Sequence, residues 1–209
     1  MTCRPFVVTL SHQLGSGAAV VGQKLAERLG VPCLDREILF QVAEKLNLAE
    51  AELAGREQRL SSFWQSFGRL VAMTDPAASL TADRYVPSDR ELFQMECDTI
   101  SRIAEKSNAI FIGRCGRYIL RGHPCQVSVL LHADLPARAQ RLAALYRLSR
   151  GDAEKLAETN DRERVAYIQT FTRQSWLDAR LYDLCLNTST LGLDRVVEAI
   201  EACVAARTA

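Results

Sequence analysis

The chain contains 209 residues, of which 26 are Lys or Arg and 25 are Asp or Glu, so its formal net charge is +1. This balance argues against a nucleic-acid binder that works by neutralising many phosphates. The apolar fraction of 48% and the charged fraction of 24% are ordinary for a globular protein and exclude a wholly disordered chain. No apolar run approaches the roughly 20 residues of a membrane-spanning helix. We therefore expect no nucleic acid and no membrane among the partners, and composition leaves the oligomeric state undetermined.

Cysteine and histidine usage indicates neither a metal centre nor a disulfide framework. The seven cysteines are scattered without a Cys-x-x-Cys pair, and the three histidines lie far apart. Most of the cysteines sit inside apolar runs, which favours buried, reduced thiols in a cytoplasmic protein. We predict no metal ligands among the side chains and a cytoplasmic location.

Short β-rich apolar segments alternate with amphipathic helical patterns through most of the chain. The first strand, at 6–10, leads into a polar, glycine-bearing loop at 11–17 and then into a helix that carries its apolar face from Val21 to Leu29. Two later strands are nearly continuous apolar runs, as expected where helices cover both faces of a sheet. We predict strands at 6–10, 31–35, 109–113, 126–131 and 184–187, and further helices at about 37–46, 90–106, within 136–173 and at the C-terminus.

The alternation of strand and helix predicts an α/β protein with a parallel sheet between two helical layers. Residues 49–90 interrupt it with an Ala/Glu-rich helical stretch and a segment rich in Thr, Asp, Pro, Ala and Ser. We interpret the chain, 1–209, as a single domain. Its core comprises 1–48 and 91–209, and 49–90 form an inserted helical lobe.

The loop after the first strand is the first candidate for a binding site, because ligands of parallel sheets lie beyond the carboxyl ends of the strands. Gly15-Ser16-Gly17 precede a helix, so backbone N–H groups and the positive helix end would together suit a phosphate. The alternative is an ordinary strand-to-helix turn that needs a positive φ at a glycine. Both interpretations remain open on the loop alone.

Two nucleotide-binding folds compete for this loop. A dinucleotide-binding interpretation uses Gly15 and Gly17, with Asp35 about twenty positions on for a ribose hydroxyl, but Val20 stands at the third glycine. A P-loop has Gly-x-x-x-x-Gly-Lys-Ser/Thr, in which the lysine grips phosphate. Here Ala18 follows Gly17, so that lysine is missing.

Further motifs follow the loop in a defined order. They lie at 10–19 (Leu-Ser-His-Gln-Leu-Gly-Ser-Gly-Ala-Ala), 34–38 (Leu-Asp-Arg-Glu-Ile), 112–120 (Ile-Gly-Arg-Cys-Gly-Arg-Tyr-Ile-Leu), 129–133 (Val-Leu-Leu-His-Ala), 160–167 (Asn-Asp-Arg-Glu-Arg-Val-Ala-Tyr) and 182–189 (Tyr-Asp-Leu-Cys-Leu-Asn-Thr-Ser). In these motifs the chain resembles, over its whole length, the cytidylate kinase-like family of P-loop nucleoside monophosphate kinases. In that family the first loop typically reads like Ile-Ser-Arg-Glu-x-Gly-Ser-Gly-Gly-Arg, also without the lysine.

The resemblance implies a three-layer α/β P-loop kinase fold with a five-stranded parallel sheet. The lobe at 49–90 would be the helical insertion that binds the monophosphate, and the arginine-rich segment at about 138–173 would be a helical lid. The implied function is ATP- and Mg²⁺-dependent phosphoryl transfer to a nucleoside monophosphate, CMP or dCMP first. Small-molecule nucleotides would then be its partners.

The resemblance also implies roles for individual residues. Guanidinium forks match phosphate oxygens, and phosphoryl transfer needs positioning and cancellation of charge. The implied catalytic residues are Arg114, Arg141 and Arg147, with Arg138 and Arg150 as further lid arginines. The implied ATP-binding residues are Ser11, His12, Gly15, Ser16, Gly17, Ala18 and Ala19. The implied acceptor-binding residues are Asp35, Arg36, Arg114, Asp161 and Arg164, of which Asp161 and Arg164 would read the cytosine edge and a nearby phosphate.

Three residues depart from the family pattern. His12 and Ala19 each replace an arginine, and Val20 stands where a Ser/Thr hydroxyl would hold Mg²⁺. One lost charged contact can cost on the order of 2–4 kcal/mol in the transition state. A nucleotide-sensing relative with little kinase activity, and a kinase for another small acceptor, are therefore alternatives.

Two further interpretations of these residues need no ligand at all. Arg138 and Arg141 are three residues apart and could both face solvent on a surface helix. Asp161 and Arg164 have the same spacing and could form an ordinary surface ion pair.

Overall fold

The computed structural model describes residues 5–35, 89–113 and 115–209. The helix predicted at 37–46 and all but the end of the predicted lobe at 49–90 lie outside the described residues, as do Arg36 and Arg114.

A parallel sheet of five strands forms the centre of the molecule, in the order β2-β3-β1-β4-β5. β1 extends two residues beyond the predicted segment, because Ser11 and His12 continue its pairing with β4. The prediction of five parallel strands is thus confirmed. The strands are β1 (Val7–His12), β2 (Cys33–Leu34), β3 (Ala109–Ile112), β4 (Gln126–His132) and β5 (Leu184–Asn187).

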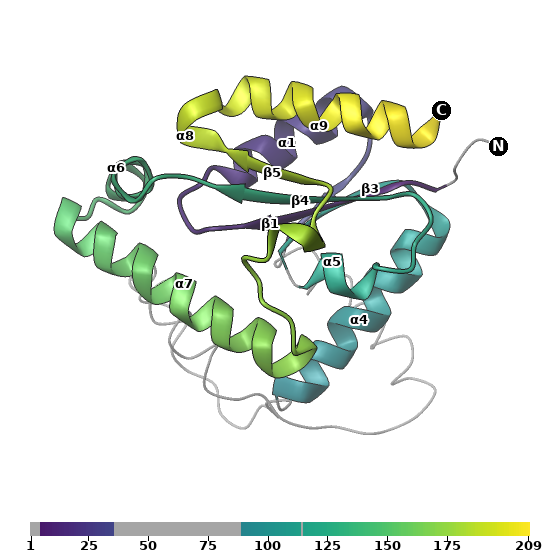
Figure 1. Cartoon of the computed structure of the whole chain (residues 1–209), viewed down its shortest axis with the longest axis horizontal. Coiled ribbons are helices and arrows are strands. Elements are labelled where there is room, and N and C mark those ends of the chain that lie inside the picture. The colour runs from purple at the N-terminus through teal and green to yellow at the C-terminus, as the bar shows by residue number, and fades with distance from the viewer. Residues whose placement is uncertain (1–4, 36–88, 114) are drawn as a thin grey trace, which may run out of the picture.

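Helices cover both faces of the sheet, which gives the three predicted layers (Figure 1). On one face lie α1 (Ala18–Leu29) and α9 (Leu193–Thr208), and on the other α4 (Asp89–Lys106) and α5 (Gly116–Ile119). A 3₁₀ turn (Ala179–Leu181) precedes β5, and the short helix α8 (Thr188–Leu191) follows it.

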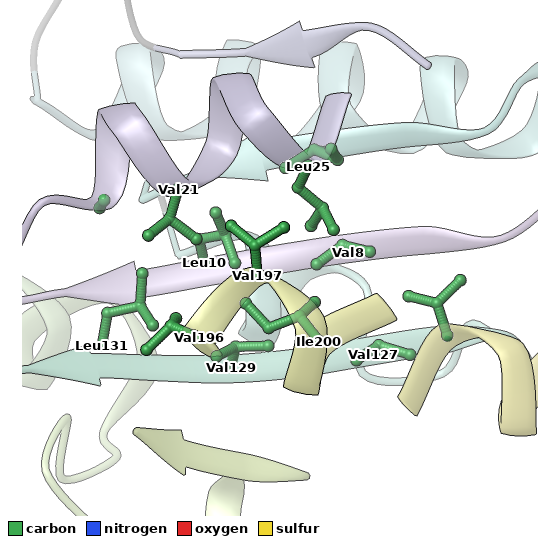
Figure 2. Packing of buried hydrophobic residues seen from close by; sticks show 13 residues of the cluster. Val8, Leu10, Val21, Leu25, Val127, Val129, Leu131, Val196, Val197 and Ile200 are labelled. Atoms are coloured by element: carbon green, nitrogen blue, oxygen red, sulfur yellow. The ribbon is translucent and has the colours of Figure 1, made fainter. Parts of the chain in front are cut away.

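The alternation of side chains along β1 divides the core between the two faces. Val8 and Leu10 pack with residues of α1 and α9, among them Leu25 and Ile200, as Figure 2 shows. Val7 points to the opposite face and belongs to a second cluster. Because both faces are covered, β1 is completely buried over these positions, as its continuous apolar run predicts.

The helical run predicted at 136–173 divides into α6 (Leu135–Tyr146) and α7 (Arg150–Thr172). Arg147 ends α6 with a φ of 56°, and the side chain of Ser149 accepts a hydrogen bond from the N–H of Asp152 as the cap of α7. The two helices pack together in a third cluster, which Leu14 from the loop after β1 joins. That cluster comprises Ala139, Leu142, Ala153 and Ala157.

Buried side chains on the face of the sheet that α1 covers should contribute strongly to the free energy of unfolding. Leu25 is completely buried, so Leu25→Ala should lower this free energy by about 2–5 kcal/mol in a urea titration. Leu145→Ala makes the same change in α6 at a side chain that is 70% exposed, and should cost less than about 0.5 kcal/mol. Equal losses in the two variants would contradict this arrangement of the core.

Candidate functional site

The loop between β1 and α1 has the backbone of an anion-binding turn. Gly15 and Gly17 have φ values of 83° and 88°, a left-handed conformation that favours glycine. Gly17 is the N-cap of α1, and neither a side-chain cap nor an acidic residue in the first turn occupies the N–H groups there. The expected positive φ is therefore present, and so is a helix end whose partial positive charge suits a phosphate.

Neighbouring chain encloses the loop tightly. A Cβ on Gly15 would lie 2.9 Å from the carbonyl oxygen of Arg138, and one on Gly17 would lie 2.7 Å from Cδ2 of Leu193. The backbone of α6 therefore rests directly against the loop, and Gly15 is required by space as well as by φ, whereas Gly17 is favoured by φ.

Arginines from α6 hold the carbonyl groups of the loop. Arg138 donates from Nε to the oxygen of Leu14 at 2.7 Å, and Arg141 donates from Nη1 to the oxygen of Gly15 at 3.1 Å. Arg141 also donates to Oγ1 and to the carbonyl oxygen of Thr188, whose hydroxyl in turn donates to the carbonyl oxygen of Ser16 at 2.7 Å. Arg141 thus joins α6, α8 and the loop.

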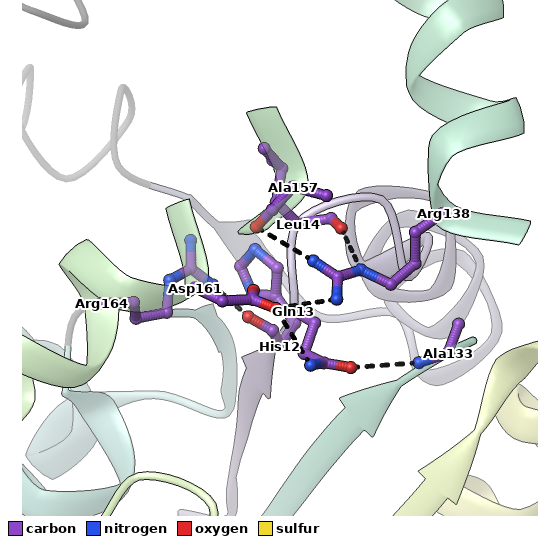
Figure 3. Close-up of polar contacts among 8 residues, drawn as sticks. All are labelled: His12, Gln13, Leu14, Ala133, Arg138, Ala157, Asp161 and Arg164. Atoms are coloured by element: carbon purple, nitrogen blue, oxygen red, sulfur yellow. Dashed lines mark hydrogen bonds and ion pairs between the residues drawn. The ribbon is translucent and has the colours of Figure 1, made fainter. Parts of the chain in front are cut away.

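Arg138 is a buried charge that α7 neutralises. Its side chain is 4% exposed, and Nη1 pairs with Oδ2 of Asp161 at 2.7 Å. Nη2 donates to the carbonyl oxygen of Ala157 at 3.3 Å, so all three guanidinium nitrogens are engaged, as Figure 3 shows. The alternative of a solvent-facing Arg138 is wrong. A buried guanidinium needs its full set of partners, and here the loop and α7 supply them.

Asp161 and Arg164 both project from α7 toward the loop, as their spacing on one helix face predicts (Figure 3). They do not form the surface ion pair that was the alternative. Asp161 pairs with Arg138, while Arg164 donates to the carbonyl oxygen of His12. The guanidinium of Arg164 also lies over the ring of the buried Trp176, 5.5 Å from its centroid.

A tyrosine packs beside the first residue of the loop. The hydroxyl of Tyr182 donates to the carbonyl oxygen of Trp176 at 2.8 Å. Burial raises the pKa of Tyr182, and a hydrogen bond with Ser11 and the charge of Arg117 partly offset that rise. The phenol therefore stays neutral near pH 7 and acts as a packing and hydrogen-bonding group.

The other expected site residues take no part in the loop contacts described above. Ala18 is buried in the core under α1, whereas Ala19 and Val20 are exposed, Val20 to 45%. Asp35 is exposed directly after β2, and Arg147 is exposed at the end of α6. Within the described part of the chain, no hydrogen bond links either of them to the loop.

Lys24 does not replace the missing loop lysine, because it pairs with Asp194 on α9.

Two site residues emerge only from the structure. Gln13 hydrogen-bonds Asp161 and the N–H of Ala133, and Thr188 bridges Arg141 and Ser16. These partners lie far away in sequence, and neither a glutamine in a loop nor a threonine after a strand carries a pattern that would have revealed them.

Polar groups without partners gather at the same place. Among the described residues, three buried side-chain atoms have no hydrogen-bond partner, and they belong to Ser16, Asn160 and Asp161. All three lie in the loop or in the segment of α7 next to it. The side chains that contact the loop from α6 and α7 include three guanidinium groups and one carboxylate. The surplus of positive charge suits an anionic ligand. The unpaired oxygens of Asn160 and Asp161 could accept hydrogen bonds from N–H or O–H groups elsewhere on the same ligand.

The described residues contain no cluster of three or more His, Cys, Asp or Glu side chains that could hold a metal ion. Burial raises the pKa of Cys33 and of Cys97 to about 11, so both thiols stay protonated near pH 7 and neither is a reactive thiolate. Cys125 is disulfide-bonded, so the expectation of reduced thiols is wrong at this position.

The helices that the structure describes include none that is long and apolar enough to cross a membrane.

Comparison with known proteins identifies relatives of this chain. The model of the cytidylate kinase-like family matches residues 7–190. A cytidylate kinase of Ignicoccus hospitalis is 28% identical over 93% of this chain and 96% of its own. An uncharacterised protein from Eubacterium ventriosum has a similar structure, with a TM-score of 0.71 at 19% identity over 96% of this chain and 98% of its own. A gluconokinase from Sinorhizobium meliloti aligns with a TM-score of 0.53 at 14% identity over 98% and 94%. The fold is that of the P-loop kinases.

The buried ion pair at the loop should matter far more than an exposed pair on the same helix. Arg138→Met leaves Asp161 without its guanidinium, and we expect a loss of about 3 kcal/mol in the free energy of unfolding. Arg150→Met removes the exposed pair with Glu154 and should change it by less than about 0.5 kcal/mol. Chemical denaturation measures both, and similar small losses would show that Arg138 does not hold the loop.

Proposed function

Because this chain belongs to the cytidylate kinase-like family, we propose that it transfers a phosphoryl group from ATP to a nucleoside monophosphate, CMP or dCMP first. The observation that carries the proposal is the uncapped N-terminus of α1 behind Gly15 and Gly17, at the carboxyl end of the central strand. A triphosphate placed there meets backbone N–H groups and the positive end of the helix. The glycines keep the backbone close enough for such contacts.

Arginines of α6 and α7 take the place of the absent lysine as the source of positive charge. Every guanidinium nitrogen of Arg138 is already hydrogen-bonded. Arg138 therefore stabilises the loop and would act on a phosphate only through the electrostatic field of its charge. Arg141 is only partly buried, and its guanidinium has five N–H donors and makes three hydrogen bonds here, so it retains donors for a phosphate oxygen. Arg164 adds a further positive charge beside the loop. Phosphoryl transfer depends mainly on positioning and cancellation of charge, which these groups supply.

Mg²⁺ enters this proposal with the nucleotide. The described residues offer no cluster of acidic ligands, and position 20 carries an apolar side chain in place of a hydroxyl. In the proposal the oxygens that Mg²⁺ prefers belong to the triphosphate and to water. The ion would neutralise charge on the phosphates when bound, and the chain would position the phosphates themselves.

The acceptor would lie on the α7 side of the loop. The unpaired Oδ1 of Asp161 can accept a hydrogen bond from the exocyclic amine of cytosine, and Arg164 stands one turn further along α7 to hold the acceptor phosphate. In the proposal the other acceptor residues are Asp35, Arg36 and Arg114, and the arginines at the transferred phosphoryl group are Arg114, Arg141 and Arg147.

A nucleotide-sensing protein with little activity is the second candidate. The observation in its favour is the side of α1 next to the phosphates, where Ala19 and Val20 are exposed and carry no charged or hydroxyl group. Nucleotide binding requires the loop and its N–H groups, whereas phosphoryl transfer also requires positive groups that stabilise the transition state. Binding and turnover must therefore be measured separately.

The class of nucleotide is tested by thermal stability in the presence of ATP, CMP, UMP, AMP and NAD, each with and without Mg²⁺. A nucleotide at 100 times its Kd should add about 2.7 kcal/mol of stability, and we expect this from ATP and CMP but not from NAD. Formation of CDP from ATP and CMP with kcat on the order of 1–100 s⁻¹ then identifies a kinase. ATP binding without turnover would favour the sensor, and selective stabilisation by NAD would overturn the proposal.

The acceptor is tested by Asp161→Asn at saturating ATP. An amide in place of the carboxylate weakens the hydrogen bond to the cytosine amine, so the preference for CMP over UMP in kcat/KM should fall by about 1–3 kcal/mol. Glu154→Gln makes the same chemical change on an exposed face of α7 and should leave the preference unaltered. An unchanged preference in Asp161→Asn would exclude this carboxylate as the cytosine reader.

A further inference from the structure

Gln13 joins the loop to two other parts of the fold. Its backbone N–H donates to the carbonyl oxygen of Leu131 at 3.0 Å, at the end of β4. Its side-chain Oε1 accepts from the N–H of Ala133 at 3.3 Å, and Nε2 donates to Oδ2 of Asp161 at 3.1 Å. The carboxamide therefore spans from the end of β4 to the middle of α7 (Figure 3).

The Asp161 carboxylate that Gln13 contacts on α7 also binds the buried guanidinium of Arg138. Oδ2 of Asp161 accepts from Gln13 and from Arg138, and Arg138 returns to the loop through the carbonyl oxygen of Leu14. Three hydrogen bonds and the peptide bond between Gln13 and Leu14 join the four residues in a closed ring, which we name the loop–α7 circuit. Leu14 also packs against the cluster that α6 and α7 share, so a shift of the loop would disturb this contact.

Gln13 lies close to where the phosphates would bind. Its carbonyl oxygen accepts from the N–H of Ser16 at 3.1 Å, which folds the loop back on itself just before Gly17. A phosphate that draws the backbone of the loop toward itself would move this carbonyl and the carboxamide with it. Asp161 is held to Gln13 and to Arg138 through Oδ2 alone, since its Oδ1 has no hydrogen-bond partner among the described residues, so a movement of the carboxamide reaches α7 through that one oxygen.

We propose that Gln13 is a positioning residue that couples nucleotide binding at the loop to the placement of α7, through Asp161 and Arg138. This inference rests on the proposed function, because it requires a nucleotide at the loop. Its consequence is that ATP orders α7, including Arg164, before the acceptor is engaged. Gln13 itself does not touch the reacting atoms in this account.

The test is hydrogen exchange with and without ATP in the full chain, with Gln13→Met as the variant. Methionine has a similar length and removes both side-chain hydrogen bonds. Gln140→Met makes the same change on the exposed face of α6 and is the matched control. In the unmodified protein and in Gln140→Met we expect ATP to slow exchange in residues 11–19 and in 157–168. In Gln13→Met the protection of 11–19 should persist and that of 157–168 should be lost.

A charged variant gives a second test of the coupling. Gln13→Glu places two carboxylates side by side and should abolish the protection of 157–168 by ATP, while that of 11–19 persists. Steady-state kinetics add a second readout: Gln13→Met should raise KM for the acceptor roughly tenfold, because the acceptor must then order α7 itself, with KM for ATP changing less than twofold.

Each outcome has one meaning. ATP protection of both segments in Gln13→Met, as in Gln140→Met, would overturn the coupling and leave the proposed function standing. Protection of 157–168 by ATP that persists in Gln13→Glu would also overturn it. Absence of any ATP protection at 11–19 in the unmodified protein would overturn the proposed function, and the coupling with it.

Discussion

The buried guanidinium of Arg138 is the constraint around which the loop, α6 and α7 are arranged. A charge that is almost entirely removed from water destabilises the fold unless charge and hydrogen bonds replace the lost solvent. Arg138 receives a carboxylate from α7 and carbonyl oxygens from the loop and from α7. Since these partners come from different segments, satisfying one side chain brings all of them together. The packing of Leu14 against the cluster that the two helices share adds an apolar contact to the same junction.

This arrangement resolves the apparent weakness of the loop as a phosphate site. P-loops usually carry a lysine on the loop itself, and here Ala18 points into the core instead. Positive charge reaches the loop from outside, through arginines that grip its carbonyl groups. Such groups stabilise the conformation of the loop and raise the local potential at the same time, so in the proposed function one set of side chains would serve both binding and architecture.

Much of the fold could be predicted from the pattern of side chains. The continuous apolar runs of β3 and β4 and the alternation with helices predict a doubly covered parallel sheet, and the glycines of the loop predict its left-handed turns. The position of the loop at the carboxyl end of the central strand was predictable as well. The partners of Arg138 and Asp161 were not, because an i, i+3 spacing is the same for a buried circuit and for a surface ion pair.

By itself the sequence determined the layers, the strands, the position of the loop and the family to which they belong, because these follow from local periodicity and from ordered motifs. Only the tertiary structure decided that Arg138 is buried, that Asp161 neutralises it, and that Gln13 links the loop to α7. Burial depends on which segments meet in space, and Gln13 and Asp161 are 148 residues apart along the chain. The physical reason is that the cost of burying a charge is met by partners that no local pattern identifies.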